Sequence, residues 1–395
     1  MIDERVRSSE PPPEVPIFGC VPTPGVSSMP RVFTWADSSD VLDALEALNL
    51  RTARGRFDRA VNEIACLDPE LATSIASCLA DLPAPAFARF ILAPEVIART
   101  SLLRAKPKLQ IPFLCMALKA ERMLSGGGLA GEDCWTALGD YYLSRSARAD
   151  MKSGKDVPAS TELVAFSAPR LSDSIALDFS SPNAQIMDSH GLPFEPYGPE
   201  EIAAVAASLQ NLFLQIVRVS QGASELITRF VKVIVLRKHT SEGHSSSSMR
   251  TYPGRVLLRN PQAADSSRLA SSLIHEAIHH TLYVVEYSGE FVMRGFQGET
   301  IRSPWTGNNI PVHSYLHACF VWYGLASFWR LPAAAEIFPA SSAQRELRRA
   351  LSGFQRGNPL DALHPYAQEI RPEALKAVGA LHDRLSEQGA LNGDA

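Results

Sequence analysis

The chain has 395 residues, of which 46% are hydrophobic and 20% charged, and its formal net charge is −4. These values are typical of a globular protein and exclude a fibrous or largely disordered chain. The slight acidic excess argues against a nucleic-acid-binding scaffold, and the six scattered cysteines contain no CxxC pair that would indicate a zinc ribbon or a thioredoxin-type motif.

The N-terminal segment, residues 1–35, is rich in proline and serine, which predicts a flexible extended arm. Its first residues are acidic and lack the apolar core of a secretory signal. The longest run without charged side chains, residues 303–329, has an apolar part that is too short for a membrane span. We therefore expect a cytoplasmic protein with free thiols and with neither a membrane nor a nucleic-acid partner.

Three further regions follow along the chain. Residues 36–170 space apolar side chains three and four apart, which predicts helices that break at Asp68-Pro69 and Pro83-Ala84-Pro85, and the polar stretch 150–170 predicts a connection. Residues 171–330 contain the candidate catalytic elements, and residues 331–395 predict helices with a polar tail. In 171–330 we expect strands at 174–179 and 255–258, a helix or strand at 226–236, and helices at 199–219, 265–287 and 312–330.

These elements predict an α-rich α+β fold. We expect a helical N-terminal part, a small antiparallel sheet beside one central helix, and a helical C-terminal part. Strands are few and do not alternate regularly with helices, so the sequence does not support a parallel βαβ architecture.

The principal chemical motif is HExxH, formed by His275, Glu276 and His279 within the predicted helix 265–287. The two histidines lie one helical turn apart, so both imidazoles can reach one ion. Glu276 lies beside them, where it can act on a metal-bound water or orient a ligand. The motif therefore predicts a metal site on this helix.

An open metal site needs a third protein ligand, which this helix does not supply at the usual later positions 282 and 285. His317, in the apolar helix 312–330, is the favoured candidate, and His313 lies one turn before it. Glu299 is the alternative, at a spacing compatible with zinc peptidases of the thermolysin kind. Glu286, seven residues after His279, is interpreted as too close to fold back.

Two neighbouring features are given lesser roles. The run Ser245–Ser248 predicts a flexible connector, although its place before the strand at 255–258 would allow it to line a cleft. His280 points about 100° away from His279 on a helix, so we expect an outer or exposed histidine rather than a ligand.

Several segments together resemble a known family. The order LIHEAIHHTLY (273–283), RSPW (302–305) and SYLHACFVWYGLASFW (314–329), with LDFSSP, FEPYGPEE, SSSS and YPGRVLL upstream, is similar to the HExxH-motif peptide-modification proteins. These are the 2-oxoglutarate-dependent (αKG-HExxH-type) peptide beta-hydroxylases associated with ribosomally made, modified peptides. The resemblance covers roughly residues 170 to 330.

The resemblance implies an Fe(II) enzyme that hydroxylates a side-chain β-carbon of a ribosomal precursor peptide, using O2 and 2-oxoglutarate. By position, His275, His279 and His317 would hold the iron, and Glu276 would orient a ligand or the peptide. Arginines that follow SPW in the family are replaced here by Thr306 and Ile310-Pro311. Arg302 is then the nearest cation that would bind 2-oxoglutarate, and the peptide is expected beside the strand at 255–258 by edge pairing.

Two other functions remain open at this stage. The first is a zinc metallopeptidase, in which the ion would activate water and Glu276 would take its proton. The second is a non-catalytic peptide-binding module with a structural metal or none, in which the N-terminal helices would bind the partner.

Overall fold

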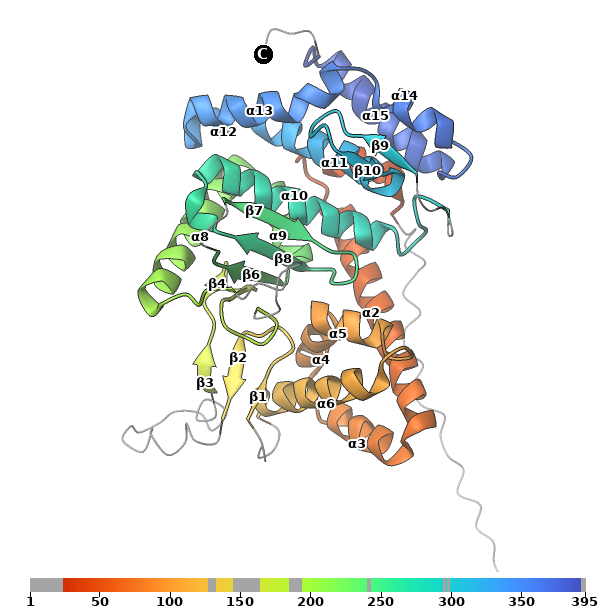
Figure 1. Ribbon diagram of the computed structural model, residues 1–395, viewed down its shortest axis with the longest axis vertical. Helices are drawn as coiled ribbons and strands as arrows, with labels where there is room; N and C mark the ends of the chain where they lie inside the picture. Colours follow the sequence, from red (N-terminus) through yellow and green to blue (C-terminus); the bar gives the residue numbers. More distant parts are fainter. Residues whose placement is uncertain are drawn as a thin grey trace, which may run out of the picture.

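The structure is a computed structural model that describes residues 24–126, 133–144, 164–184, 194–239, 243–293, 296 and 299–391. Figure 1 shows helices at both ends of the chain with a sheet between them. The protein has the predicted α-rich α+β fold.

The N-terminal helices are η1 (Val26–Ser28), α1 (Met29–Val32), α2 (Ser39–Leu67), α3 (Pro69–Ala80), α4 (Ala84–Ile91), α5 (Pro94–Ser101) and α6 (Pro107–Leu124). Both predicted breaks are confirmed. Asp68 ends α2 and caps α3 by accepting a hydrogen bond from the Leu71 N–H, and a proline then starts α3 where no N–H is needed.

The predicted flexible arm is wrong in its last part. Met29 and Phe33 are fully buried, and they belong to the core that holds the C-terminal helices. Apolar residues three or four apart from Val26 onward outweigh the prolines and serines around them. The arm's remaining residues, 1–23, lie outside the described residues.

A small antiparallel sheet follows α6. It consists of β1 (Cys134–Trp135), β2 (Tyr141–Leu143) and β3 (Val164–Ser167), in that order. The predicted connection 150–170 thus includes β3, and its stretch 150–163 lies outside the described residues. The five described cysteines, from Cys66 to Cys319, are free thiols.

The central sheet has five strands in the order β4-β5-β6-β8-β7. They are β4 (Arg170–Leu171), β5 (Ile175–Asp178), β6 (Val233–Arg237), β7 (Ser245–Ser248) and β8 (Arg255–Arg259). β5, β6 and β8 run parallel, whereas β4 and β7 are antiparallel edge strands. The expectation of an antiparallel sheet was therefore wrong at its centre.

The crossover between β5 and β6 explains the parallel centre. It contains α8 (Pro199–Val219) and α9 (Gln221–Phe230), and a connection of this length returns the chain to the same end of the sheet. The ambiguous segment 226–236 is both a helix end and a strand. Within the described residues, α8 is the one helix that is long and apolar enough to cross a membrane. The absence of a membrane partner therefore stays a prediction.

Alternating side chains of the parallel strands enter two different cores. Ile175, Ile234 and Val256 belong to the large core on one face, while Ala176 and Val233 belong to a smaller core on the other. The smaller core packs the sheet against the helices α2 to α6, and the large core packs it against the second half of the chain. Period-two burial on both faces is what a covered parallel sheet requires.

The large core contains α10 (Ser266–Val285) and α11 (Val312–Trp329), joined by a loop with the hairpin β9 (Thr300–Arg302) and β10 (Asn309–Pro311). A short helix η3 (Pro261–Ala263) precedes α10. α10 lies between the sheet and the C-terminal helices (Figure 1). Those helices are α12 (Pro332–Ile337), α13 (Ala340–Gln355), α14 (Pro359–Leu363), η4 (His364–Tyr366) and α15 (Pro372–Glu387).

Candidate metal centre

Helix α10 carries the HExxH motif. Asp265 starts the helix by accepting a hydrogen bond from the Arg268 N–H at 2.9 Å, as its position predicts. The rings of His275 and His279 lie on one side with centroids 4.9 Å apart, and both are half-buried. The opposite side is apolar and fully buried in the large core, so packing holds the two imidazoles at a partly open face.

Helix α11 brings the second pair of histidines to this face. Gly324 allows the close approach of the helices, because a Cβ at that position would lie 2.6 Å from Cδ1 of Ile278 on α10. As a result, Nδ1 of His279 lies 3.2 Å from Nδ1 of His317. The ring of His313 lies next to His317, with centroids 4.4 Å apart. The predicted His275, His279 and His317 thus form a continuous row of neighbouring rings.

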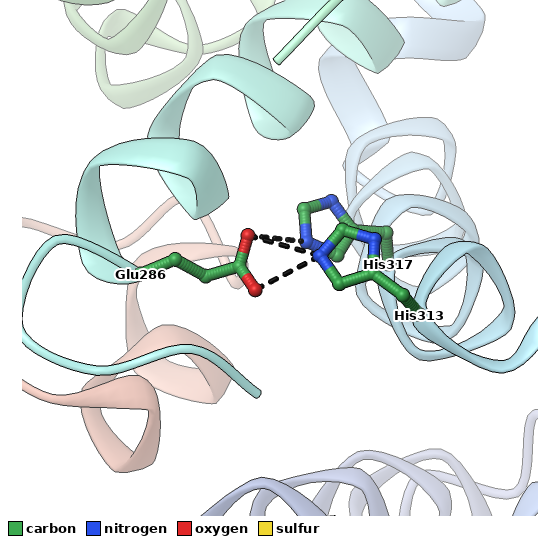
Figure 2. Close-up of side chains that lie close together, drawn as sticks. All are labelled: Glu286, His313 and His317. Atoms are coloured by element: carbon green, nitrogen blue, oxygen red, sulfur yellow. Dashed lines mark hydrogen bonds and ion pairs between the residues drawn. The ribbon is translucent and has the colours of Figure 1, made fainter. Parts of the chain in front are cut away.

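Glu286, which the sequence interpretation set aside, lies within this cluster. Its carboxylate oxygens are 2.9 and 3.0 Å from Nε2 of His313, and one of them is 3.4 Å from Nε2 of His317 (Figure 2). No folding back is needed, because seven residues are two helical turns and Glu286 therefore lies on the same side of the helix as His279. This spacing of seven residues could have identified Glu286 as a neighbour of His279 from the sequence.

Glu286, His313 and His317 form the one group in the described part of the chain whose ligand atoms all lie within 4.8 Å of one another. The predicted His275, His279 and His317 do not form such a group. The structure therefore contains two overlapping sets of donors that share His317. Two histidines and one carboxylate are a ligand set of non-heme Fe(II) and also of catalytic Zn(II).

Burial favours the neutral, metal-binding form of His275, His279 and His317. Burial lowers the pKa of His317 to about 4, and burial lowers the pKa of His275. The pKa of His279 lies well below its ordinary value because of burial and of the surrounding histidines. A neutral imidazole keeps the lone pair that a metal ion needs, so the donor chemistry fits a divalent cation.

Glu276 points to the sheet. Its side chain is buried, and its Oε1 accepts a hydrogen bond from Oγ of Ser246 at 2.7 Å. A second contact lies nearby, because Nε2 of His244, the residue before β7, lies 2.9 Å from Oγ of Ser272 on α10. The run Ser245–Ser248 is therefore strand β7, and its interpretation as a flexible connector was wrong. Pairing with β8 and these contacts to α10 order it.

Aromatic rings enclose the histidines. Trp322 lies edge-on to His275, Tyr283 lies against His279 and His317, and Phe291 lies against His317. His317 is left with 1% of its surface exposed. The enclosure keeps water from the deeper side of the cluster.

Two predicted residues, Glu299 and Arg302, are exposed. The backbone carbonyl of Glu299 accepts a hydrogen bond from the Val312 N–H, and Arg302 lies on β9. A cation that contacts the cluster is Arg250, whose Nε lies 3.9 Å from Oε2 of Glu286 and whose Nη2 donates to Glu290. Arg250 follows β7, and the sequence interpretation assigned it no role.

His280 is buried, so of the two expected positions, outer or exposed, the exposed one is wrong. Its Nδ1 accepts a hydrogen bond from the Gly254 N–H at 3.0 Å. Gly254 has φ +91°, which favours glycine, and this turn leads directly into β8.

No protein-family model matches the chain, and a search of curated proteins found no match.

Proposed function

We propose that the protein is an Fe(II)- and 2-oxoglutarate-dependent oxygenase that hydroxylates a side-chain β-carbon of a peptide, with a ribosomal precursor peptide as substrate. The HExxH, RSPW and SYLHACFVWYGLASFW segments support this proposal, and so do the neutral imidazoles of His275, His279 and His317 between α10 and α11. The observation that carries it is the hydrogen bond from Ser246 to Glu276. It directs one oxygen of the motif's glutamate to a strand of the sheet, whereas a peptidase directs that carboxylate to a water molecule on the metal.

The predicted ligands are His275, His279 and His317. The donor atoms of all three do not lie within 4.8 Å of one another, so His275 would have to move toward the other two rings to bind the same ion. The facing Nδ1 atoms of His279 and His317 lie 3.2 Å apart, a separation that suits two ligands of one ion with bonds of about 2.1 Å. When bound, Fe(II) and 2-oxoglutarate supply the oxidising power that inserts one oxygen atom of O2 into a C–H bond. The half-buried rings of His275 and His279 leave the ion accessible from one side.

Glu276 would connect helix α10, which carries the proposed ligands His275 and His279, to the sheet. Its buried carboxylate accepts from Ser246, so it fixes β7 against α10 near His275. Arg302 remains the predicted partner of the 2-oxoglutarate carboxylate, but Arg250 lies beside the cluster and is half exposed. We therefore propose Arg250 as the better-placed cation, with Arg302 as the comparison.

The peptide would add to the sheet at β7. The predicted place, beside the strand at 255–258, is not available because β8 is paired on both sides by β6 and β7. β7 is the last strand of the sheet, and Ser245 and Ser247 are exposed while Ser246 and Ser248 are half-buried. An extended peptide paired with this edge would pass beside the HExxH helix, since β7 contacts α10 through Ser246.

A zinc metallopeptidase is the second candidate. Two histidines and a glutamate, as in Glu286, His313 and His317, are a common set of catalytic zinc ligands, and the same set also suits non-heme Fe(II). A third candidate is a peptide-binding module whose metal is structural. Both alternatives predict that 2-oxoglutarate is not consumed.

The test uses the full chain, purified without oxygen and loaded with Fe(II) or with Zn(II). We expect the Fe(II) form, with O2 and 2-oxoglutarate, to release succinate and to add one oxygen atom to a peptide in a mixture of synthetic candidates, as seen by mass spectrometry. His279→Ala should abolish both signals. Cleavage of a peptide by the Zn(II) form, without succinate release from the Fe(II) form, would establish the peptidase instead.

A further inference from the structure

His317 presents its two ring nitrogens to two different neighbours. Nδ1 lies 3.2 Å from Nδ1 of His279, and Nε2 lies 3.4 Å from Oε2 of Glu286. The ring is 1% exposed and Nε2 has no aligned hydrogen-bond partner among the described residues. A neutral imidazole carries one N–H and one lone pair, so the two neighbours decide which nitrogen is which.

The Glu286 side favours a proton on Nε2. The Glu286 side chain is fully buried, and Nε2 of His313 and the N–H of Phe291 donate to its oxygens at 2.9 to 3.1 Å. All of these contacts are donated to the carboxylate, so its oxygens act as acceptors toward the groups around them. A lone pair on Nε2 of His317 would face these acceptor oxygens at short range in a buried place, whereas an N–H would be attracted to them.

The His279 side favours a free Nδ1. Two facing ring nitrogens at 3.2 Å are compatible when one donates to the other, or when both turn lone pairs toward a cation. With the proton of His317 on Nε2, its Nδ1 carries the lone pair in either case. Histidine ligands of metals commonly donate their other ring N–H to a carboxylate, which fixes the ring and strengthens the ligand.

We propose that Glu286, held in place by His313, is a positioning residue that keeps His317 in its Nε2–H form and so presents Nδ1 to a divalent cation beside His279. This inference rests on the proposed function only in assuming that a divalent cation binds at this site. His317 belongs to both donor sets because its two nitrogens have different roles. Nε2 faces Glu286, and Nδ1 faces the one ion. A second ion at Glu286 is disfavoured because the Arg250 guanidinium already lies 3.9 Å from the carboxylate.

The first experiment needs no metal. In the metal-free full chain with ¹⁵N-labelled histidine, long-range ¹H–¹⁵N correlation spectra distinguish a protonated ring nitrogen from a bare one. We expect His317 to show a protonated Nε2 and a bare Nδ1. Glu286→Ala should shift His317 toward a mixture of both forms, while Glu286→Gln, which retains an acceptor oxygen, should largely preserve the Nε2–H form. Glu290→Gln, a matched change at the neighbouring acid, should leave the His317 signals unchanged.

The second experiment titrates Zn(II) into the same proteins and measures affinity and stoichiometry by calorimetry. We expect one ion per chain, and Glu286→Ala should weaken its binding about 10- to 100-fold, with a smaller loss for Glu286→Gln. Should Glu286→Ala fail to fold, the spectrum of the unsubstituted protein and the Glu286→Gln variant still decide the question.

Three results would overturn the inference. These are a proton on Nδ1 of His317 in the unsubstituted protein, a tautomer unchanged by Glu286→Ala, or two Zn(II) ions of which that variant loses one. The last result would place an ion between Glu286 and His317. Failure of the proposed function looks different, because the unsubstituted protein would then bind no ion or would leave 2-oxoglutarate unconsumed.

Discussion

The Oγ of Ser246 lies 2.7 Å from Oε1 of Glu276, so the last strand of the sheet is hydrogen-bonded to the glutamate of the HExxH motif. The two residues are 30 positions apart in the chain, and the carboxylate is buried. The strand that would receive a peptide and the helix that would hold the ion are thereby placed against each other.

Removing this hydrogen bond should loosen β7. We expect Ser246→Ala to lower the free energy of unfolding by about 1 to 3 kcal/mol, because a buried carboxylate oxygen loses its donor. Urea denaturation followed by circular dichroism measures the change. Ser245→Ala is the matched control: its side chain is exposed, and a change within about 0.5 kcal/mol is expected. Equal effects of the two substitutions would remove the structural role of the Ser246 contact.

Metal binding should depend on both helices. We expect His279→Ala and His317→Ala to lower the affinity for Fe(II) or Zn(II) by about 100-fold or more, because each removes a ligand. His275→Ala should have the same effect if the predicted three histidines hold the ion. Metal analysis after dialysis reads out the loss, with His364→Ala, an exposed ring on η4, as control. A variant at residue 317 that retains its metal would eliminate that ligand.

The spacing of α10 and α11 should respond to Gly324. A methyl group there would meet Cδ1 of Ile278 at 2.6 Å, so Gly324→Ala is expected to cost about 1 to 3 kcal/mol of stability and to weaken metal binding by separating His279 from His317. Thermal unfolding and calorimetric titration report the two effects. On α2, Gly55→Ala meets its nearest atom at 3.7 Å and should be neutral or stabilising. Unchanged metal affinity in Gly324→Ala would show that the helix spacing does not set the site.

Asp178 should make stability depend on pH. Burial raises its pKa from 3.8 to about 6, although hydrogen bonds from Ser181 and Ser180 favour the charged form. Because the folded pKa lies above the unfolded one, its contribution to stability is largest below about pH 4 and is lost as the pH rises to about 6. This difference corresponds to roughly 3 kcal/mol.

The corresponding measurement compares the protein with Asp178→Asn by urea denaturation at several pH values. The amide can still accept from the Ser181 N–H, so the variant should fold. Its unfolding free energy is expected to fall less between pH 4 and pH 6 than that of the unsubstituted protein. Parallel pH profiles would show that Asp178 stays ionised in the folded state.

Local sequence patterns predicted the elements around the candidate site well. α10, α11, β5 and β8 lie where periodicity and an Asp265 cap place them, because burial on one face imposes a pattern along the chain. The rows His275–His279 and His313–His317 were visible for the same reason. The contact between Nδ1 of His279 and Nδ1 of His317 arises from tertiary packing, which depends on Gly324.

Other features carried no local signal strong enough to predict them. Strand β7 is four serines, and only its pairing with β8 and its contacts to α10 make it a strand. The parallel pairing of β5 with β6 depends on a crossover of two helices. Counting two helical turns from His279 could have placed Glu286 on the same side of α10. Its contact with His313, however, arises from the packing of α11 on α10.

The hydrogen bond from Gly254 to His280 would make the proposed metal site select between two adjacent histidines of α10. A neutral imidazole has one lone pair, and that of His280 is already spent on the Gly254 N–H, leaving a protonated Nε2 that repels cations. An incoming ion therefore finds no competing donor at this ring, although it directly follows His279. The turn before β8 would thus keep one of two adjacent histidines out of the proposed coordination.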